Sequence, residues 1–426
     1  MAKTKAQYRF SDHYKIHKPQ SQLDFVDIPM DTDVSLYVDP YGLSVSGDDW
    51  LRECGNIIVN FFDTFLTAIR DADETKALSL ISNLHEPNDT HLGVSSGRPS
   101  GRGWGGKQGQ MLYDRLRGSV AVLSGSLRDL EDIELLMPGI GSDKISDLAV
   151  NVIRGELVAY TEEQCQLFDV PTERINSGLY WDFDVRAWAS RYADLPVYRD
   201  KRLVLVPKLA VRTKLIPDHY EFYNRFVLDF LAAEHLKAND SLVTLLKNGT
   251  AKVFRRDLKS RHRLSKEFLL DFSLQHPEVL DAYKKTLPTK ARPIDSRDIE
   301  DRQRIPRATV TFESADLFSI PTGADHADMY HSTILGILTE VFYPSLTHPT
   351  KEQPVDNGRK RIDIFFRNSA ESGFFSRLVN MHKILCPYVS VECKNYKVDP
   401  ANPELDQLMG RFSRKRVSSD SSCVGI

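Results

Sequence analysis

Apolar side chains recur at helical spacing through most of the first 285 residues of this chain. The clearest case is the segment from residue 56 to residue 72, where four large apolar side chains follow one another every four positions. Such a stripe predicts an amphipathic helix that buries one face in a core. The same spacing predicts three further helices, at residues 111–123, 142–168 and 220–237.

Alternating apolar and polar residues predict strands elsewhere. Short strands are expected at residues 35–40 and 202–211. Two longer alternating runs follow toward the C-terminus, at residues 360–368 and 384–396, and a helical pattern at residues 329–346 precedes them. The C-terminal part is therefore expected to combine a small sheet with helices.

Residues 286–320 combine prolines with dense mixed charge, which is the composition of a linker or an extended connector. We place the domain boundary in this segment. The expected organisation is a mainly helical recognition or regulatory region over residues 1–285, a linker, and a smaller domain over residues 321–426. The predicted fold class is α/β (α+β), with a helical N-terminal region followed by a mixed-sheet domain.

The composition excludes several classes of protein. Apolar residues make up 41% of the chain and charged residues 27%, the balance of a globular protein rather than a fibrous or disordered one. No run of about 18 apolar residues and no signal-peptide pattern is present, so we expect a cytoplasmic protein without a membrane partner. The five cysteines form no CxxC pair, which argues against structural zinc.

Positive charge gathers in two segments of a chain whose formal net charge is −3. Residues 341–426 contain 13 lysines and arginines against nine acidic residues. Between residues 252 and 266, seven lysines and arginines accompany a single acid, Asp257. This second segment fits a basic helix or arm, although a solvated helix face explains it without any partner. Charge alone therefore permits a polyanion partner without requiring one.

The most informative segment is the run ILCPYVSVECKNY at residues 384–396. Strand alternation puts Glu392 and Lys394 on the same face, about 6.6 Å apart along the strand. A carboxylate and an ammonium would then project side by side from a stiff scaffold. In the preceding run, KRIDIFFRN, Asp363 stands among apolar residues, and its burial would require a partner or a bound cation. On adjacent strands, Asp363 and Glu392 could meet over one divalent ion.

An acid followed on the next strand by a hydrophobic–Glu–x–Lys pattern resembles the PD-(D/E)xK, or restriction-endonuclease-like, nuclease superfamily. The resemblance covers about 100 of the 426 residues. It implies that Asp363 and Glu392 hold a divalent metal together with the backbone carbonyl of Cys393. It also implies that Lys394 orients or deprotonates the attacking water.

Further candidate site residues lie outside this motif. The resemblance suggests two further catalytic residues, Glu340 on the helix before the strands and Gln407 on a helix expected after them. Three arginines near the motif are candidates for contacts with nucleic-acid phosphates, namely Arg359, Arg361 and Arg411.

The activity that the resemblance implies is metal-dependent hydrolysis of phosphodiester bonds, with Mg²⁺ or Mn²⁺ as cofactor and DNA preferred over RNA. By analogy, an endonuclease of this kind suits a prokaryotic restriction or antiviral defence effector. The alternative is a catalytically inactive nucleic-acid-binding or assembly module on a nuclease fold. Family members usually continue beyond the Gln407 helix, so we expect a C-terminally incomplete domain, or a homo-oligomer or partner protein that completes the sheet.

A glycine-rich stretch offers a third hypothesis. Residues 101–108 read GRGWGGKQ, which fits the pattern G-x-x-x-x-G-K. A phosphate-binding loop needs Ser or Thr for Mg²⁺ where this chain has Gln108. A nucleotide-dependent switch in the N-terminal region is therefore a less favoured hypothesis than the nuclease or the inactive module.

Overall fold

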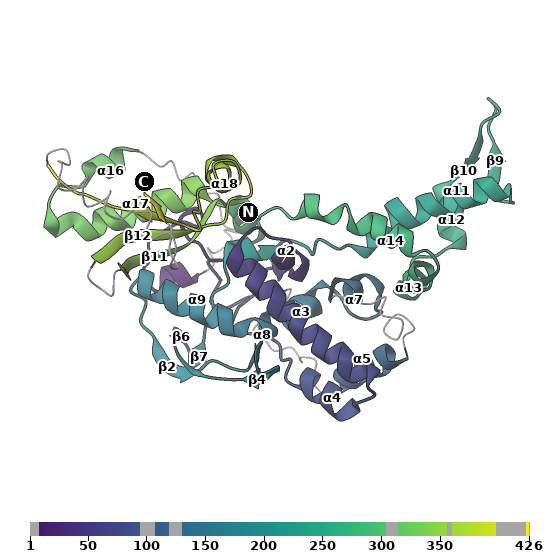
Figure 1. The fold of residues 1–426 in the computed structure, drawn as a ribbon, viewed down its shortest axis with the longest axis horizontal. Coiled ribbons are helices and arrows are strands. Elements are labelled where there is room, and N and C mark those ends of the chain that lie inside the picture. Colours follow the sequence, from purple (N-terminus) through teal and green to yellow (C-terminus); the bar gives the residue numbers. More distant parts are fainter. Residues whose placement is uncertain are drawn as a thin grey trace, which may run out of the picture.

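Three hydrophobic cores organise the computed structural model of this chain. The structure describes residues 8–93, 107–118, 130–303, 314–355, 360–397 and 423–425. Figure 1 shows a broad central body, an arm that projects from one end, and a sheet with its helices at the other end. The predicted fold class is confirmed, because the protein is α+β with a mainly helical N-terminal region. Among the described helices, none is both long and apolar enough to cross a lipid bilayer.

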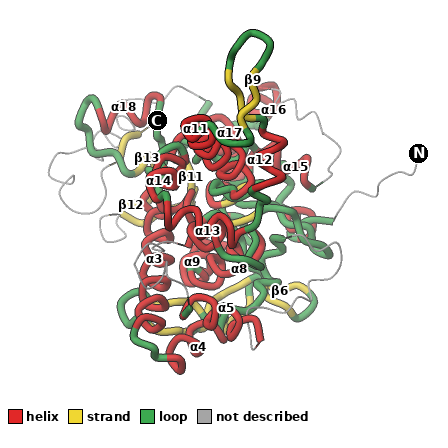
Figure 2. The backbone as a smooth tube through the Cα atoms, turned by 90° about the vertical axis from the view of Figure 1, so that its right-hand side faces the viewer, coloured by secondary structure: helices red, strands yellow, loops and turns green. Residues whose placement is uncertain are grey.

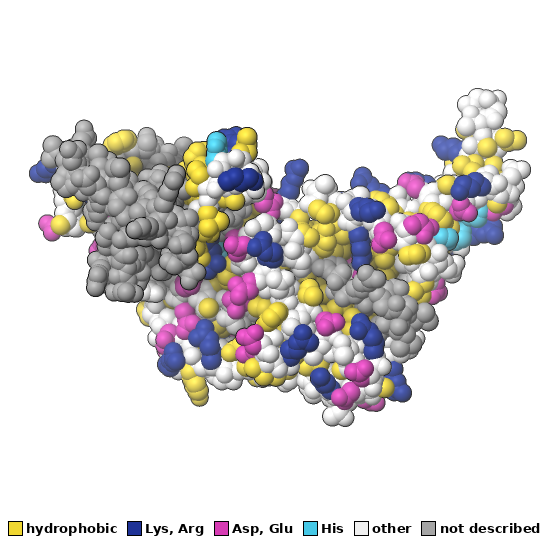
Figure 3. Space-filling model, in the orientation of Figure 1, with side chains coloured by type: hydrophobic (Ala, Val, Ile, Leu, Met, Phe, Trp, Pro, Cys, Tyr) yellow, Lys and Arg dark blue, Asp and Glu magenta, His cyan; other side chains and the backbone are white. Residues whose placement is uncertain are grey.

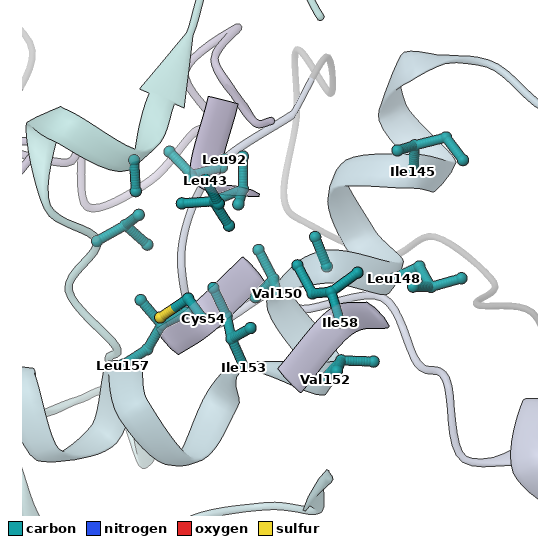
Figure 4. Packing of buried hydrophobic residues seen from close by; sticks show 14 of the residues in the cluster. Leu43, Cys54, Ile58, Leu92, Ile145, Leu148, Val150, Val152, Ile153 and Leu157 are labelled. Carbon is teal, nitrogen blue, oxygen red and sulfur yellow. The ribbon is translucent and has the colours of Figure 1, made fainter. Parts of the chain in front are cut away.

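The first core fills the central body and is built around the long helix α3 (Asp49–Arg70). The side chain of Asp48 caps this helix by accepting a hydrogen bond from the main-chain N–H of Leu51 at 2.8 Å. Large apolar side chains on the buried face of α3 pack against α8 (Ser142–Val152) and α9 (Arg154–Leu167). Figure 4 shows part of this packing, which confirms that the apolar stripe on α3 faces a core.

The segment 142–168, predicted as one helix, is two helices that meet at Ile153. This residue has φ −87° and ψ 12°, so it ends α8 and precedes α9. The two helices share the first core, yet Leu157 of α9 lies in that core while Leu167, at the end of α9, lies in the third core. Helix α9 therefore connects the central body with the C-terminal sheet.

The remaining elements of the central body are short. Its other helices are α1 (Phe10–His13), α2 (Pro40–Ser44), α4 (Glu74–Ser82), α5 (Lys107–Arg117) and α7 (Leu130–Leu136), with 3-10 turns η1 (Gln20–Gln22) and η2 (Lys208–Ala210). Its strands form antiparallel pairs, β1 (Tyr37–Val38) with β8 (Val211–Arg212), β2 (Glu173–Asn176) with β5 (Tyr192–Leu195), β3 (Tyr180–Asp182) with β4 (Ala187–Ala189), and β6 (Val197–Tyr198) with β7 (Lys201–Arg202).

Residues 202–211, predicted as a strand, are mostly buried extended chain instead. The stretch from Leu203 to Val206 is at most 1% exposed, but regular strand pairing is found only at the two ends of the segment. Main-chain groups in between bond to separate parts of the chain, as when the N–H of Val204 donates to the carbonyl of Asp89 at 2.8 Å. The apolar pattern of this segment therefore indicates that it is buried, and not that it belongs to a sheet.

The second core is formed mainly by residues 218–290, which we call the arm, with contributions from Leu135, Leu136 and Ile216. The helix predicted at residues 220–237 is present, with a π-helical turn inside it. Figure 2 shows the β9 hairpin projecting beyond the helices of the arm. The elements of the arm are α10 (His219–Phe222), η3 (Tyr223–Val227), α11 (Leu228–Ala238), β9 (Val243–Leu245), β10 (Ala251–Val253), α12 (Arg255–Arg261), α13 (Lys266–Gln275), α14 (Pro277–Lys284) and η4 (Leu287–Lys290).

The segment expected to be a linker, residues 286–320, is only partly an extended connector. It contains α15 (Ser296–Arg302) and α16 (Ser314–Ser319). Ile294 and Ile299 are buried in the first core. The first half of this segment therefore packs as a part of the central body.

The third core lies between a mixed sheet and helix α17 (Ala327–Phe342), with α18 (Gly373–Asn380) beside it. In the sheet, Ile364 and Phe366 are buried and face this core, as the predicted alternation requires. The strand order is β11 (Leu346–Val355), β12 (Lys360–Asn368), β13 (Tyr388–Val391) and β14 (Cys423–Gly425), antiparallel except for the last pair.

Buried aromatic and polar contacts join the sheet to the central body. His348 on β11 is 2% exposed and lies between the rings of Trp50 and Tyr160, with centroid distances of 4.8 and 5.0 Å. Burial is the main cause that lowers the pKa of His348 to about 4. Nearby, Lys18 of the N-terminal region donates to the main-chain carbonyl of Ser332 on α17 at 2.7 Å. The sheet is thus held on the body by contacts that include a neutral imidazole.

The buried His348 should make the folded state sensitive to acid. Its folded pKa of about 4 lies below the ordinary value of 6.5, so unfolding takes up a proton between these two pH values. The contribution of His348 to the free energy of unfolding should be fully present above pH 6.5. It should fall by about 1.4 kcal/mol per pH unit as the pH drops toward 4. Thermal unfolding at several pH values measures this slope.

The matched variant is His348→Asn, because His348 has φ 48° and asparagine tolerates left-handed backbone. Its melting temperature should fall less between pH 6.5 and pH 5 than that of the wild type. Equal slopes in the two proteins would show that His348 does not titrate on unfolding.

Candidate metal and phosphodiester site

The pairing of β12 with β13 sets the position of Asp363. Ile364 pairs with Val391 at the end of the antiparallel ladder, and continuing the register by one residue sets Asp363 opposite Glu392. Just beyond the ladder, Oδ2 of Asp363 accepts a hydrogen bond from the main-chain N–H of Cys393 at 2.7 Å. The Asp363 carboxylate therefore holds the segment after β13 against β12.

Glu392 and Lys394 form an ion pair at the same place. Nζ of Lys394 donates to Oε1 of Glu392 at 2.6 Å, and the two side chains are 24% and 12% exposed. Burial lowers the pKa of Lys394, but the hydrogen bond to Glu392 and the charges of Glu392 and Asp363 outweigh it and raise the pKa above its ordinary value. Lys394 is therefore a protonated, partly shielded cation at neutral pH.

Helix α17 adds a third element to the site through His331. One potential ligand atom each from His331, Asp363 and Cys393 lies within 4.8 Å of the other two. His331 and Asp363 are half-buried, and Cys393 is buried. Burial first, and then the charges of Asp363 and Glu392, raises the pKa of the Cys393 thiol to about 12. The imidazole and the carboxylate are thus ready ligands, whereas the thiol would have to lose its proton to bind a metal.

The side chains in this cluster differ from the all-oxygen set that the resemblance implied. There, Cys393 was expected to contribute only its backbone carbonyl, but the structure directs its Sγ atom toward His331 and Asp363. Imidazole suits first-row transition metals, Zn²⁺ above Mn²⁺ in affinity, whereas Mg²⁺ prefers carboxylates and water. The residues fit a divalent ion, and of the two expected metals they favour Mn²⁺.

Glu340 lies on α17 but away from this cluster. It accepts a hydrogen bond from Nε2 of Gln22 at 3.2 Å and acts electrostatically on Lys208, both in the N-terminal region. The nine residues from His331 to Glu340 correspond to about two and a half turns and about 13 Å of helix. The two side chains therefore point to opposite sides of α17, and the predicted place of Glu340 in the catalytic centre does not match the structure.

The structure does not describe the side chains of the other predicted positions. Gln407, Arg359 and Arg411 lie outside the described residues. Arg361 belongs to β12, but its side chain is also outside the description. The roles of these four residues stay predictions.

Sequence patterns did not single out His331, since no second histidine stands at ligand spacing from it. The available signal is the apolar stripe of α17. Leu335, Leu338 and Phe342 follow His331 by four, seven and eleven residues, and all three contribute to the third core. These spacings put His331 on the helix face that meets the sheet.

Comparison with known proteins concerns a different part of the chain. Residues 15–216 match a family described as a domain of unknown function, DUF8370. No curated protein and no solved structure matches this chain. The matched segment covers most of the central body, ends before the arm and contains none of the residues of the site, so it neither supports nor opposes nuclease chemistry.

Metal binding by this cluster can be measured directly. Titration of the chain with Mn²⁺, followed by the electron paramagnetic resonance signal of the free ion, should show one site. His331→Gln and Asp363→Asn should each weaken binding at least about 10-fold, because each removes one of the two ready ligands. The control is His382→Gln, since His382 is exposed and outside the cluster. Equal affinity in all four proteins would contradict the assignment.

Proposed function

We propose that this protein is a metal-dependent phosphodiesterase that hydrolyses nucleic acid, with DNA favoured over RNA by the superfamily resemblance. One observation carries the proposal. Asp363 bonds to the main chain between Glu392 and Lys394, and His331 approaches the same point from α17. A carboxylate, an imidazole and a cation around one partly exposed spot are the groups that metal-assisted hydrolysis of a phosphodiester needs.

The residues of the chain divide the chemical work. A bound divalent ion would polarise the phosphate and lower the pKa of a water molecule. Asp363 and His331 would hold that ion. Lys394 would place its positive charge where negative charge develops on the phosphoryl oxygens. Because its pKa is raised, Lys394 is better suited to orienting water and stabilising charge than to removing a proton.

The ion pair favours a second candidate function. Glu392 and Lys394 satisfy each other at 2.6 Å, and Asp363 already accepts a main-chain hydrogen bond. The same three side chains can therefore stabilise the segment after β13 in a module that binds nucleic acid without cutting it. In that case binding would persist and hydrolysis would be absent. The narrower hypothesis of a restriction or antiviral effector stays a prediction.

A cleavage assay separates the two candidates. Linear and circular DNA, single-stranded oligonucleotides and RNA should be tested with Mn²⁺, with Mg²⁺ and with EDTA. Hydrolysis should require the metal, and Lys394→Ala should lower its rate at least about 100-fold because charge stabilisation in the transition state is lost. Binding of the same substrate in EDTA should change far less than the rate.

Glu340→Gln is the matched control for this assay. It also removes a charge, on the helix that carries His331, but on the face that contacts Gln22 and away from the cluster. Its rate should stay close to that of the wild type. Binding without any metal-dependent hydrolysis by the wild-type protein would favour the inactive module. A loss in Glu340→Gln as large as in Lys394→Ala would show that the proposed site is misplaced.

A further inference from the structure

The base of the arm uses some of its positive charge for packing. Nζ of Lys266 donates to the main-chain carbonyl of Glu134 in α7 and, at 2.7 Å, to that of Ile140, which follows α7. Lys284 forms an ion pair with the buried Asp132 of α7. These lysines fix the arm on the central body, so their charge has a structural role.

The end of the arm is different. We call residues 243–263 the arm tip, which comprises the β9–β10 hairpin and α12 with the residues after it. The single acidic residue of the tip, Asp257, pairs with Arg256. Arg255 pairs with Asp229 of α11, outside the tip. The tip exposes seven basic side chains, namely Lys247, Lys252, Arg255, Arg256, Lys259, Arg261 and Arg263.

Four of these cations have no acidic partner in the described part of the chain. No carboxylate there lies within 4.0 Å of the side-chain nitrogens of Lys247, Lys252, Lys259 or Arg263. Arg261 acts electrostatically on Asp240 without forming such a pair. Lys252 also lies over the ring of Phe254, 5.5 Å from its centroid. The tip therefore carries an excess of positive charge that no carboxylate of the described residues neutralises.

The positions of these cations suit an extended polyanion. Lys247 lies in the turn of the hairpin, Lys252 lies on β10, Lys259 lies on α12, and Arg263 follows α12. The charges are thus spread over the tip, as contacts to successive phosphates along a strand require. Figure 3 shows lysine and arginine side chains at the surface of the arm, and Figure 1 shows that the arm projects into solvent.

We propose that the arm tip binds the phosphate backbone of nucleic acid. The inference rests on the proposed function for the kind of polyanion, and it deepens that function by naming a surface that holds the substrate. A membrane surface fits less well, because the large apolar side chains that the tip exposes are only Leu245 and Phe254, too few for an inserted face. Charge complementarity therefore selects nucleic acid as the occupant.

The test is a binding titration with the full chain, a fluorescent single-stranded or duplex DNA and EDTA to prevent cleavage. The arm variant combines Lys252→Gln, Lys259→Gln and Arg263→Gln. It should bind at least 10-fold more weakly at low salt. The slope of log affinity against log salt concentration should become shallower by about 3. Binding releases about one counterion for each phosphate that the protein neutralises, and the variant lacks three of these contacts.

The control variant combines Lys76→Gln, Lys201→Gln and Arg186→Gln, which removes the same charge from exposed positions of the central body. It should keep the wild-type affinity and salt slope, and thermal melts should show that both variants fold. Equal weakening in the two variants would overturn the proposal, since net charge alone would explain it. So would wild-type affinity in the arm variant, or arm-dependent binding to anionic vesicles or to an acidic protein in place of DNA.

The outcome for the arm can be told apart from the outcome for the nuclease. DNA binding that depends on the arm tip, without hydrolysis at any metal concentration, supports the arm and rejects the proposed function. Hydrolysis that Lys394→Ala abolishes, at a rate and substrate affinity unchanged in the arm variant, supports the nuclease and rejects the arm.

Discussion

The hydrogen bond from the Cys393 main-chain N–H to the Asp363 carboxylate is the contact on which the site depends. Regular pairing of β13 ends at Val391, so the next residues have no ladder to hold them. The Asp363 side chain holds the start of this segment, and hydrogen bonds between Asn395 and Gly323 hold its continuation, so that Glu392 and Lys394 lie beside Asp363. A half-buried carboxylate between apolar neighbours is costly unless it is paired, and here one pairing satisfies the acid and also orders the segment that carries the lysine.

Local patterns predicted the parts of the site that depend on strand geometry. The period of two along β12 sets Ile364 and Phe366 on one face and Asp363 on the other, and the first two lie in the third core. The ion pair between Glu392 and Lys394 agrees with the same rule. For Ile364 and Phe366 the pattern within one strand decides the outcome. Glu392 and Lys394 follow the end of β13 at Val391, so their place also depends on the hydrogen bond to Asp363.

Helical positions were predicted less well, because the sequence of a helix does not show which neighbouring element packs on each of its faces. Glu340 and His331 share α17, yet the sheet selects one face of the helix and the N-terminal region contacts another. Likewise, the single helix expected at residues 142–168 is divided at Ile153, and the apolar stretch 202–211 is buried without joining a sheet. Tertiary contacts with distant segments decide each of these features, and a single sequence does not reveal them.

The three cores also separate the tasks that we assign to the protein. The arm and the C-terminal sheet lie at opposite ends of the central body (Figure 1). Changes at the arm tip are therefore expected to alter the affinity for a polyanion without touching the residues around Asp363. The central body, where the family match falls, holds the sheet through α9 and the buried contacts of His348. It holds the arm through the contacts of Lys266 and Lys284.

The most direct test of the account is a crystal structure of the chain soaked with Mn²⁺ and measured near the manganese absorption edge. The account predicts an anomalous scattering peak at bonding distance from a ring nitrogen of His331 and an oxygen of Asp363, with the Lys394 ammonium nearby. A structure that places these side chains as described, but shows no peak between them or shows manganese bound elsewhere, would contradict it.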